Sequence, residues 1–145
     1  MALISYITQI QIDFGAARLL PQECERSAIR NPLVVTDAGV RAAGVLDHAL
    51  KALGALPHAV FDQTPSNPTE AAVRAAVELF KARRCDGLVA VGGGSSIDLA
   101  KGVAIAATHD GPLKTYATIE GGSAKIGDRV APLIAVPTTA GTGSE

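Results

Sequence analysis

Residues 91–101 read VGGGSSIDLAK, and this stretch decides the fold. It follows the apolar run from Leu88 to Val91 and leads into a segment, Ser95 to Ala107, that we predict to be a helix. Glycines let the backbone turn tightly and let a ligand approach the main chain. A helix that begins at such a turn points its free N–H groups and the positive end of its dipole at the ligand, which favours phosphate. The stretch therefore predicts a pyrophosphate-binding turn at the carboxyl end of a parallel strand.

The common phosphate-binding motifs do not match this turn. A G-x-G-x-x-G fingerprint requires a glycine where Ile97 stands, and the chain contains no Gly-Lys-Ser/Thr triplet of a P-loop. The alternative is a tight strand-to-helix turn without a ligand. A second polar turn favours the ligand-binding interpretation. Residues 137–145 (PTTAGTGSE) form this turn and follow another apolar run, Leu133 to Val136.

Length and composition restrict the class of protein. A chain of 145 residues suffices for one domain with a buried core. Its net charge of −1 and aromatic content of 3 % argue against a nucleic-acid partner or a membrane surface. Residues 1–14 lack the basic and apolar regions of a signal peptide. Cys24 and Cys85 form no C-x-x-C pair. Because no secretory signal precedes them, we expect both to be reduced thiols and the protein to be cytoplasmic.

Strand-like and helix-like segments alternate along the chain. This alternation predicts an α/β fold with a doubly wound, mostly parallel sheet. Alternating or continuous apolar residues predict strands at 4–14, 33–36, 58–61, 88–91 and 133–136. Helical periodicity predicts helices at 16–30, 40–53, from Thr69 onward and at 95–107, with an irregular region at 108–129.

The two polar turns together resemble motifs of the iron-containing (group III) alcohol dehydrogenase family, whose members carry GGGSxxDxAK and PTTAGTGSE stretches. Val34-Val35-Thr36-Asp37 is similar to the family's second strand, and residues 65–69 (PSNPT) are similar to its P-x-N-P turn. The resemblance extends from about residue 10 onward. It implies that residues 1–145 form a dehydroquinate synthase-like dinucleotide-binding domain, incomplete at its C-terminal end, with a helical metal-binding domain expected beyond Glu145.

The resemblance also implies an activity. We expect an NAD-dependent, metal-assisted alcohol dehydrogenase that transfers hydride between NAD and a small alcohol or aldehyde, with this chain supplying the cofactor half and inactive alone. The metal would be Fe²⁺, with Zn²⁺ as the alternative, and the enzyme a homodimer or larger homo-oligomer. We assign no catalytic or metal residue, because His48, His58 and His109 are scattered and the family's ligands lie beyond this chain.

Three other interpretations remain open at this point. Glycerol dehydrogenases and maleylacetate reductases are relatives on the same fold. The third is a non-catalytic nucleotide-binding module that ends at Glu145. A reading frame that continues beyond Glu145 into a histidine-bearing helical stretch would exclude the module.

Two candidate site residues follow predicted strands. Asp37 can accept hydrogen bonds from the adenine ribose and repel a 2′-phosphate, which predicts NAD in preference to NADP. The alternative role for Asp37 is a helix N-cap. The resemblance implies that Asn67 reaches the cofactor, whereas the local alternative is an Asx-turn.

The remaining candidates lie in the two polar turns. Gly93, Gly94, Ser95 and Ser96 would hold the pyrophosphate, mainly through backbone N–H groups. The resemblance implies that Asp98 lies in the cofactor pocket on the nicotinamide ribose side, and Lys101 is expected to pair with a carboxylate. Three hydroxyls of the second turn can bind a ribose, a phosphate or an adenine edge, because a hydroxyl forms hydrogen bonds without carrying a charge. They are those of Thr138, Thr139 and Thr142. The alternative is that this segment is a threonine-rich β-turn that binds no ligand.

Overall fold

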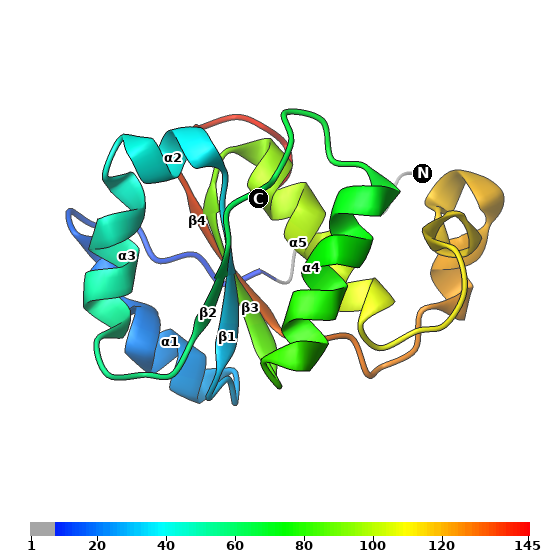
Figure 1. Ribbon diagram of the computed structural model, residues 1–145, viewed down its shortest axis with the longest axis horizontal. Coiled ribbons are helices and arrows are strands. Elements are labelled where there is room, and N and C mark those ends of the chain that lie inside the picture. The colour runs from blue at the N-terminus through cyan, green and yellow to red at the C-terminus, as the bar shows by residue number, and fades with distance from the viewer. Residues whose placement is uncertain (1–7) are drawn as a thin grey trace, which may run out of the picture.

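The computed structural model describes residues 8–145, in which four strands form one parallel sheet (Figure 1). The strands are β1 (Pro32–Val35), β2 (Ala59–Phe61), β3 (Gly87–Gly92) and β4 (Leu133–Pro137). They lie in the order β2-β1-β3-β4, and every neighbouring pair is parallel. From β1 the chain first crosses to β2 on one side and then returns to β3 on the other. The strand order therefore reverses between β1 and β3.

Helices cover both faces of the sheet, which confirms the doubly wound prediction (Figure 1). One face carries the 3₁₀ turn η1 (Ala16–Leu19) and the helices α1 (Leu20–Arg26), α2 (Ala38–Ala42) and α3 (Val45–Leu53). The other face carries α4 (Glu70–Ala82) and α5 (Gly94–Ala106). All six residues of β3 are buried, as expected for a strand covered on both sides.

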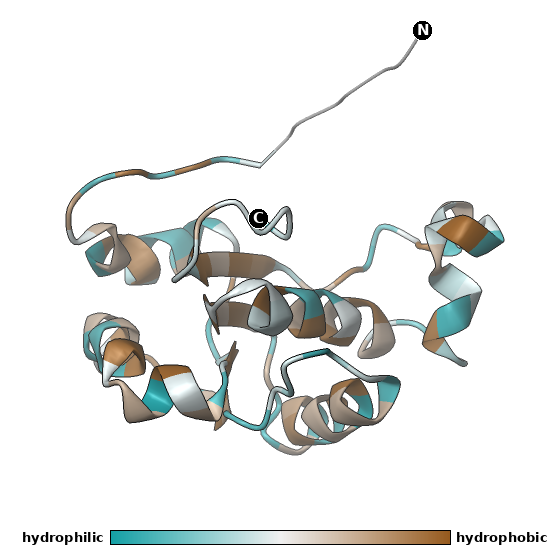
Figure 2. Ribbon diagram, turned by 90° about the horizontal axis from the view of Figure 1, so that it is seen from above, coloured by the Kyte–Doolittle hydropathy of each residue, from teal (hydrophilic) through white to brown (hydrophobic). Residues whose placement is uncertain are grey.

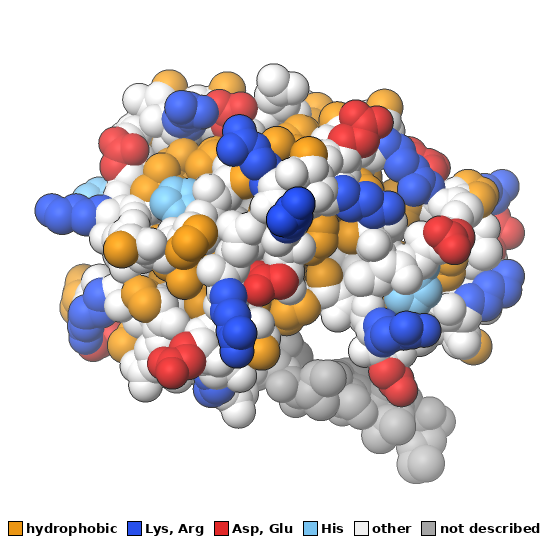
Figure 3. All heavy atoms as spheres, turned by 60° about the horizontal axis from the view of Figure 1, so that its bottom comes forward, with side chains coloured by type: hydrophobic (Ala, Val, Ile, Leu, Met, Phe, Trp, Pro, Cys, Tyr) orange, Lys and Arg blue, Asp and Glu red, His pale blue; other side chains and the backbone are white. Residues whose placement is uncertain are grey.

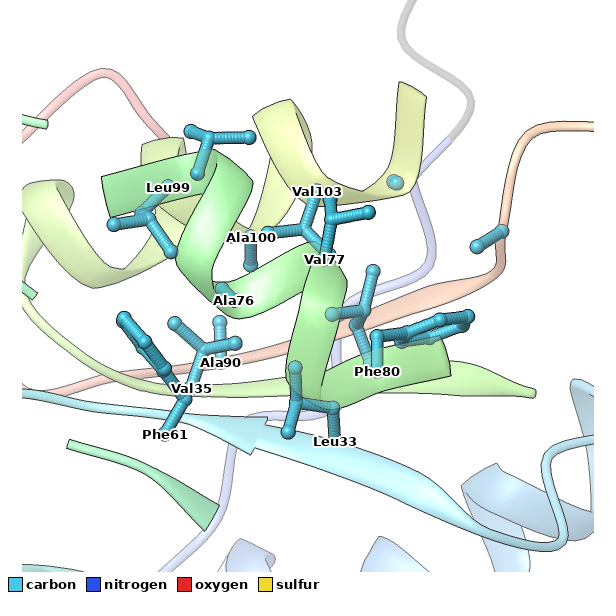
Figure 4. Packing of buried hydrophobic residues seen from close by; sticks show 14 of the residues in the cluster. Leu33, Val35, Phe61, Ala76, Val77, Phe80, Ala90, Leu99, Ala100 and Val103 are labelled. Carbon is cyan, nitrogen blue, oxygen red and sulfur yellow. The ribbon is translucent and has the colours of Figure 1, made fainter. Parts of the chain in front are cut away.

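Alternate residues of each strand enter the two cores. Val34 packs with the α1 and α3 layer, while Leu33 and Val35 pack with the α4 and α5 layer (Figure 4). Helix α4 presents the predicted apolar face, which includes Val73 and Phe80, and Thr69 caps it as predicted. The apolar strands lie between these two helical layers in Figure 2. Burial of these side chains is the main force that holds the sheet between its helices.

Residues 108–129 make an excursion beside α4 and α5, containing the 3₁₀ turns η2 (Leu113–Tyr116), η3 (Thr118–Glu120) and η4 (Gly122–Lys125). The backbone N–H of Gly127 donates to Nε2 of His109 over 2.9 Å. The His109 ring also packs edge-on against Tyr116, with ring centroids 5.3 Å apart. The imidazole of His109 thus joins the excursion to the end of α5, and Arg74 and Glu70 of α4 bind it through the carbonyl of Gly111 and the N–H of Leu113.

Three predicted elements differ from the structure. Of the strand predicted at 4–14, residues 1–7 lie outside the described residues, and residues 8–14 form no strand. That prediction was wrong for 8–14, because no neighbouring strand pairs with them and the side chain of Phe14 is 98 % exposed. The helix predicted at 40–53 is two helices, because Gly44 adopts a left-handed φ of 73° between them. The first helix ends at Arg26, before Ala28 at φ 57°.

No helix within residues 8–145 has both the length and the apolar character that crossing a membrane requires. Lys, Arg, Asp and Glu side chains intermix over the face shown in Figure 3. That face therefore carries no broad patch of one charge.

Candidate functional site

The loops that follow β1, β2 and β3 surround a cavity of about 380 Å³ at the carboxyl ends of the strands. In doubly wound sheets ligands bind at this edge, where the strand order reverses. Three residues from each loop line the cavity: Asp37, Ala38 and Gly39 after β1, Thr64, Pro65 and Ser66 after β2, and Gly93, Gly94 and Ser95 after β3. Four predicted site residues, Asp37, Gly93, Gly94 and Ser95, therefore come together.

Helix α5 begins at this cavity without a capping side chain. Its N-cap is Gly93, and within residues 8–145 no side chain accepts a hydrogen bond from its first turn. The N-termini of α2 and α4 differ, since Asp37 accepts from the N–H of Val40 over 2.9 Å and Thr69 accepts from that of Ala72 over 3.2 Å. The first N–H groups of a helix have no partner within the helix. Those of α5 thus remain available to an anion at the positive end of the helix dipole.

The second polar turn lies directly against the first. A Cβ on Gly94 would lie 3.0 Å from Oγ of Ser144 and 3.2 Å from Cβ of Thr142. A Cβ on Gly93 would lie 3.5 Å from Oγ1 of Thr139. The contact at Gly94 is tight, so the second turn occupies the space that a side chain at this position would need, whereas at Gly93 a Cβ would make an ordinary contact. The two stretches singled out in the sequence are therefore neighbours in space.

Asp37 both caps a helix and lines the cavity, so the two roles considered for it are compatible. One carboxylate oxygen, Oδ1, accepts from Val40, while Oδ2 accepts from Oγ of Ser96 over 3.4 Å. Asp37 is half-buried between these contacts and the cavity. Its carboxylate is thus held at the rim by the chain itself.

The two serines of the first turn use their hydroxyls within the protein. Oγ of Ser95 donates to the carbonyl oxygen of Ser66 over 2.5 Å, which ties the loop after β2 to the start of α5. Ser96 is fully buried, with 0 % of its surface exposed, and does not line the cavity. Ser95 therefore lines the cavity, whereas the side chain of Ser96 lies behind it.

Six of the predicted cofactor contacts do not line this cavity: Ser96, Thr139 and Thr142, described above, and three further residues, Asn67, Asp98 and Thr138. Asp98 is exposed and forms the expected ion pair with Lys101, with 3.5 Å between Oδ1 and Nζ. Asn67 is exposed in the turn before α4 and does not line the cavity. Thr138 donates its N–H to the carbonyl of Gly92 over 2.9 Å and lines a second cavity of about 330 Å³, on the α3 side of the sheet.

Two buried hydroxyls near the cavity, those of Thr36 and Thr64, have no hydrogen-bond partner in the described part of the chain. Buried hydroxyls are normally paired, so each such group calls for an explanation. Thr64 also lines the cavity, with 8 % of its surface exposed. The sequence interpretation missed Thr64 as a site residue. Its position shortly after β2 was the available signal, because the loops after parallel strands gather at one edge.

Metal ligands do not converge in the described part of the chain: no three His, Cys, Asp or Glu side chains within residues 8–145 come together. The two cysteines are free and buried on opposite faces of the sheet. Burial raises the pKa of the Cys85 thiol to about 11, with a smaller contribution from Asp86. Burial likewise raises the pKa of Cys24.

This chain has a doubly wound parallel sheet, and α5 begins at a glycine N-cap beside the point where the strand order reverses. These features define the class of nucleotide-binding domains. Comparison with known proteins specifies the family. The profile described as iron-containing alcohol dehydrogenase matches residues 8–145. The chain therefore belongs to the iron-containing alcohol dehydrogenase family, as its motifs predicted.

Individual relatives agree with this assignment. The chain is 68 % identical to 4-hydroxybutyrate dehydrogenase of Cupriavidus necator over 145 residues, which are 100 % of this chain and 38 % of the relative. The solved structure of 1,3-propanediol oxidoreductase superimposes with a TM-score of 0.80 at 38 % identity, covering 90 % of this chain and 34 % of that one. Sulfoacetaldehyde reductase from Bifidobacterium kashiwanohense, solved in complex with NAD⁺, gives a TM-score of 0.77 at 30 % identity, covering the same 90 % and 34 %.

The chain thus spans little more than a third of the length of these relatives. Their matched segments show that the fold of this chain is that of the family's nucleotide-binding domain. One of them was solved with NAD⁺.

Proposed function

We propose that this chain binds NAD in the cavity at the carboxyl ends of β1, β2 and β3. It would supply the cofactor half of an enzyme that transfers hydride between NAD and a small alcohol or aldehyde. The observation that carries the proposal is the uncapped start of α5 in that cavity, at the point where the strand order reverses. Residues 1–145 act, in this proposal, as the dinucleotide-binding domain.

The residues present fit a dinucleotide. Gly93 and Gly94 carry no side chains that would keep a pyrophosphate from the backbone at the start of α5, and at Gly94 a side chain would also press against Thr142 and Ser144. Asp37 lies on the neighbouring strand β1, where a carboxylate can accept the ribose hydroxyls of the adenosine half. The unpartnered Thr64 hydroxyl at the same cavity is a further group that a ligand could satisfy after a small side-chain rotation.

The chain's own residues would bind and orient the cofactor. The first N–H groups of α5 hold the pyrophosphate, and the carboxylate of Asp37 fixes the ribose and disfavours a 2′-phosphate. We further propose that Thr139 and Thr142, against the glycine turn, contact the cofactor, and that Asn67 and Asp98 contact it from outside the cavity. Bound NAD would accept or donate the hydride.

The substrate is proposed from the relatives. The high identity to a 4-hydroxybutyrate dehydrogenase makes 4-hydroxybutyrate the first candidate among small alcohols. We expect this chain alone to leave 4-hydroxybutyrate unoxidised in the presence of NAD, because it spans only the cofactor-binding third of that relative. Turnover by the pure 145-residue chain would contradict this expectation.

The residues described here do not fit an iron site, because no three potential ligands converge within 8–145. A homo-oligomeric assembly and a cytoplasmic location remain part of the proposal. Free, buried thiols of this kind are usual in a reducing compartment.

An NADH fluorescence titration with NADPH in parallel tests the proposal. The chain has no tryptophan, so nicotinamide fluorescence is read without a tryptophan background. We expect saturable binding of NADH and much weaker binding of NADPH. Gly94→Val should abolish NADH binding, because its side chain would fill the space against Thr142 and Ser144. Failure of a folded wild-type chain to bind either dinucleotide would refute the proposal.

A further inference from the structure

We infer that Ser96 is a positioning residue for cofactor selectivity, which acts through Asp37 and does not touch the cofactor. The inference rests on the proposed binding of NAD in the cavity. It starts from one hydrogen bond, in which Oγ of Ser96 donates to Oδ2 of Asp37 over 3.4 Å. The two residues are 59 positions apart in the sequence and follow two different strands, β1 and β3.

Burial restricts what the Ser96 hydroxyl can contact. The residue is fully buried and does not line the cavity, whereas its neighbour Ser95 does. Its only side-chain hydrogen bond among the described residues goes to Asp37. A ligand in the cavity would therefore meet the carboxylate of Asp37 and not the hydroxyl behind it.

Gly92 allows this contact to form. A Cβ at position 92 would overlap Oγ of Ser96, lie 2.8 Å from its Cβ and lie 3.5 Å from Oδ2 of Asp37. The absence of a side chain at Gly92 thus leaves the space through which the serine reaches the carboxylate. The third partner of this arrangement is the N–H of Val40, which holds the other carboxylate oxygen at 2.9 Å.

The consequence for binding is preorganisation. With one oxygen held by α2 and the other by α5, the Asp37 carboxylate is kept at the cavity rim before any ligand arrives. A carboxylate held there repels the 2′-phosphate of NADP and meets the ribose hydroxyls of NAD without first being ordered. Ser96 therefore links the residue that selects the ribose to the helix that would hold the pyrophosphate.

A double-mutant cycle tests the inference. For the wild type, Ser96→Ala, Asp37→Asn and the double variant, the Kd values of NADH and NADPH are measured by nicotinamide fluorescence. We expect Ser96→Ala to lower the ratio of the NADPH Kd to the NADH Kd by about three- to ten-fold, the effect of losing a typical intramolecular hydrogen bond. In the Asp37→Asn background the same substitution should leave the ratio unchanged, because the charge through which Ser96 acts is gone.

Ser95→Ala is the matched control. It removes the neighbouring hydroxyl, which binds the carbonyl of Ser66 and not Asp37, so it should weaken NADH and NADPH to the same extent. Far-UV circular dichroism verifies the fold of each variant. If Ser96→Ala does not fold, Ser96→Cys retains a weaker donor at the same place and should give an intermediate ratio.

Three outcomes overturn the inference. An unchanged ratio in folded Ser96→Ala, together with normal NADH binding by the wild type, refutes the role of Ser96 alone. An equal change of the ratio in the Asp37→Asn background shows that Ser96 does not act through the carboxylate. Absence of dinucleotide binding by the wild type refutes this inference and the proposed function together.

Discussion

The substitution Gly92→Ala tests the geometry at the end of β3 most directly. Gly92 has a φ of 155°, a conformation that side chains rarely adopt, and a Cβ there would overlap Oγ of Ser96. Backbone strain of this kind costs about 1–3 kcal/mol. Inserting an atom into a filled site costs about 1–3 kcal/mol more, because Ser96 is fixed in the first turn of α5 and cannot withdraw. We therefore expect the free energy of unfolding to fall by about 2–6 kcal/mol, the sum of these two costs.

Urea unfolding followed by far-UV circular dichroism measures this loss, since the chain has no tryptophan to report on its folding. Gly141→Ala is the matched control: it has a φ of 73° but no atom within 4 Å of a Cβ. It should lose only about 1–2 kcal/mol, from the left-handed backbone alone. Ser96→Gly supplies the second control, because removing the Ser96 side chain removes the atoms that the new Cβ would meet.

In the Ser96→Gly background the cost of Gly92→Ala should fall to that of backbone strain, about 1–3 kcal/mol. Two results would refute the reasoning. One is a Gly92→Ala variant as stable as the wild type. The other is a cost that is the same with and without the Ser96 side chain, which would show that the overlap plays no part.

Three further predictions concern selectivity and the thiols. Asp37→Gly should relax the preference for NADH over NADPH, and an unchanged ratio of the two Kd values would contradict the role of the carboxylate. Asp62 forms an ion pair with Arg41, one turn after Asp37. Asp62→Asn should free the guanidinium and improve NADPH binding about two-fold, an effect that Arg41→Ala should remove and that high salt should weaken. The buried thiol of Cys85, whose pKa is raised to about 11 from an ordinary 9.0, should react slowly with a disulfide reagent at pH 8 and quickly in urea. Since the folded pKa is the higher one, its contribution to stability is complete below pH 9 and is lost as the pH rises towards 11, and Cys85→Ala should diminish that loss.

Much of the fold could be predicted because its signals are local. The buried run of β3, the apolar face of α4 and the Thr69 cap each depend on residues a few positions apart, so the sequence pattern alone identifies them. The break at Gly44 was equally local but was missed, because the apolar spacing of residues 40–53 continues across it. The predicted N-terminal strand was wrong for residues 8–14. Alternating apolar and polar residues indicate that a segment can form a strand, but they do not show whether another strand is there to pair with it.

The residues of the candidate site likewise include some that the sequence could identify and some that it could not. The glycine turn and Asp37 could be identified because a small residue or a carboxylate directly after a buried strand indicates a ligand-facing loop. Ser96 could not be separated from Ser95 by pattern, since both follow the glycines, yet one is buried against Asp37 and the other lines the cavity. Likewise, nothing in the sequence around Thr64 indicated that its hydroxyl would be buried without a partner.

The sequence by itself therefore determined the parallel α/β architecture, the family and the two glycine-containing turns, because these depend on short-range periodicity and on residues without side chains. Only the tertiary structure decided which loops meet. Placing β1 between β2 and β3 brings the loops after these three strands around one cavity and sets Asp37 against Ser96. Contacts of that kind depend on the order of the strands in the sheet, and the alternation of strands and helices along a chain does not specify that order.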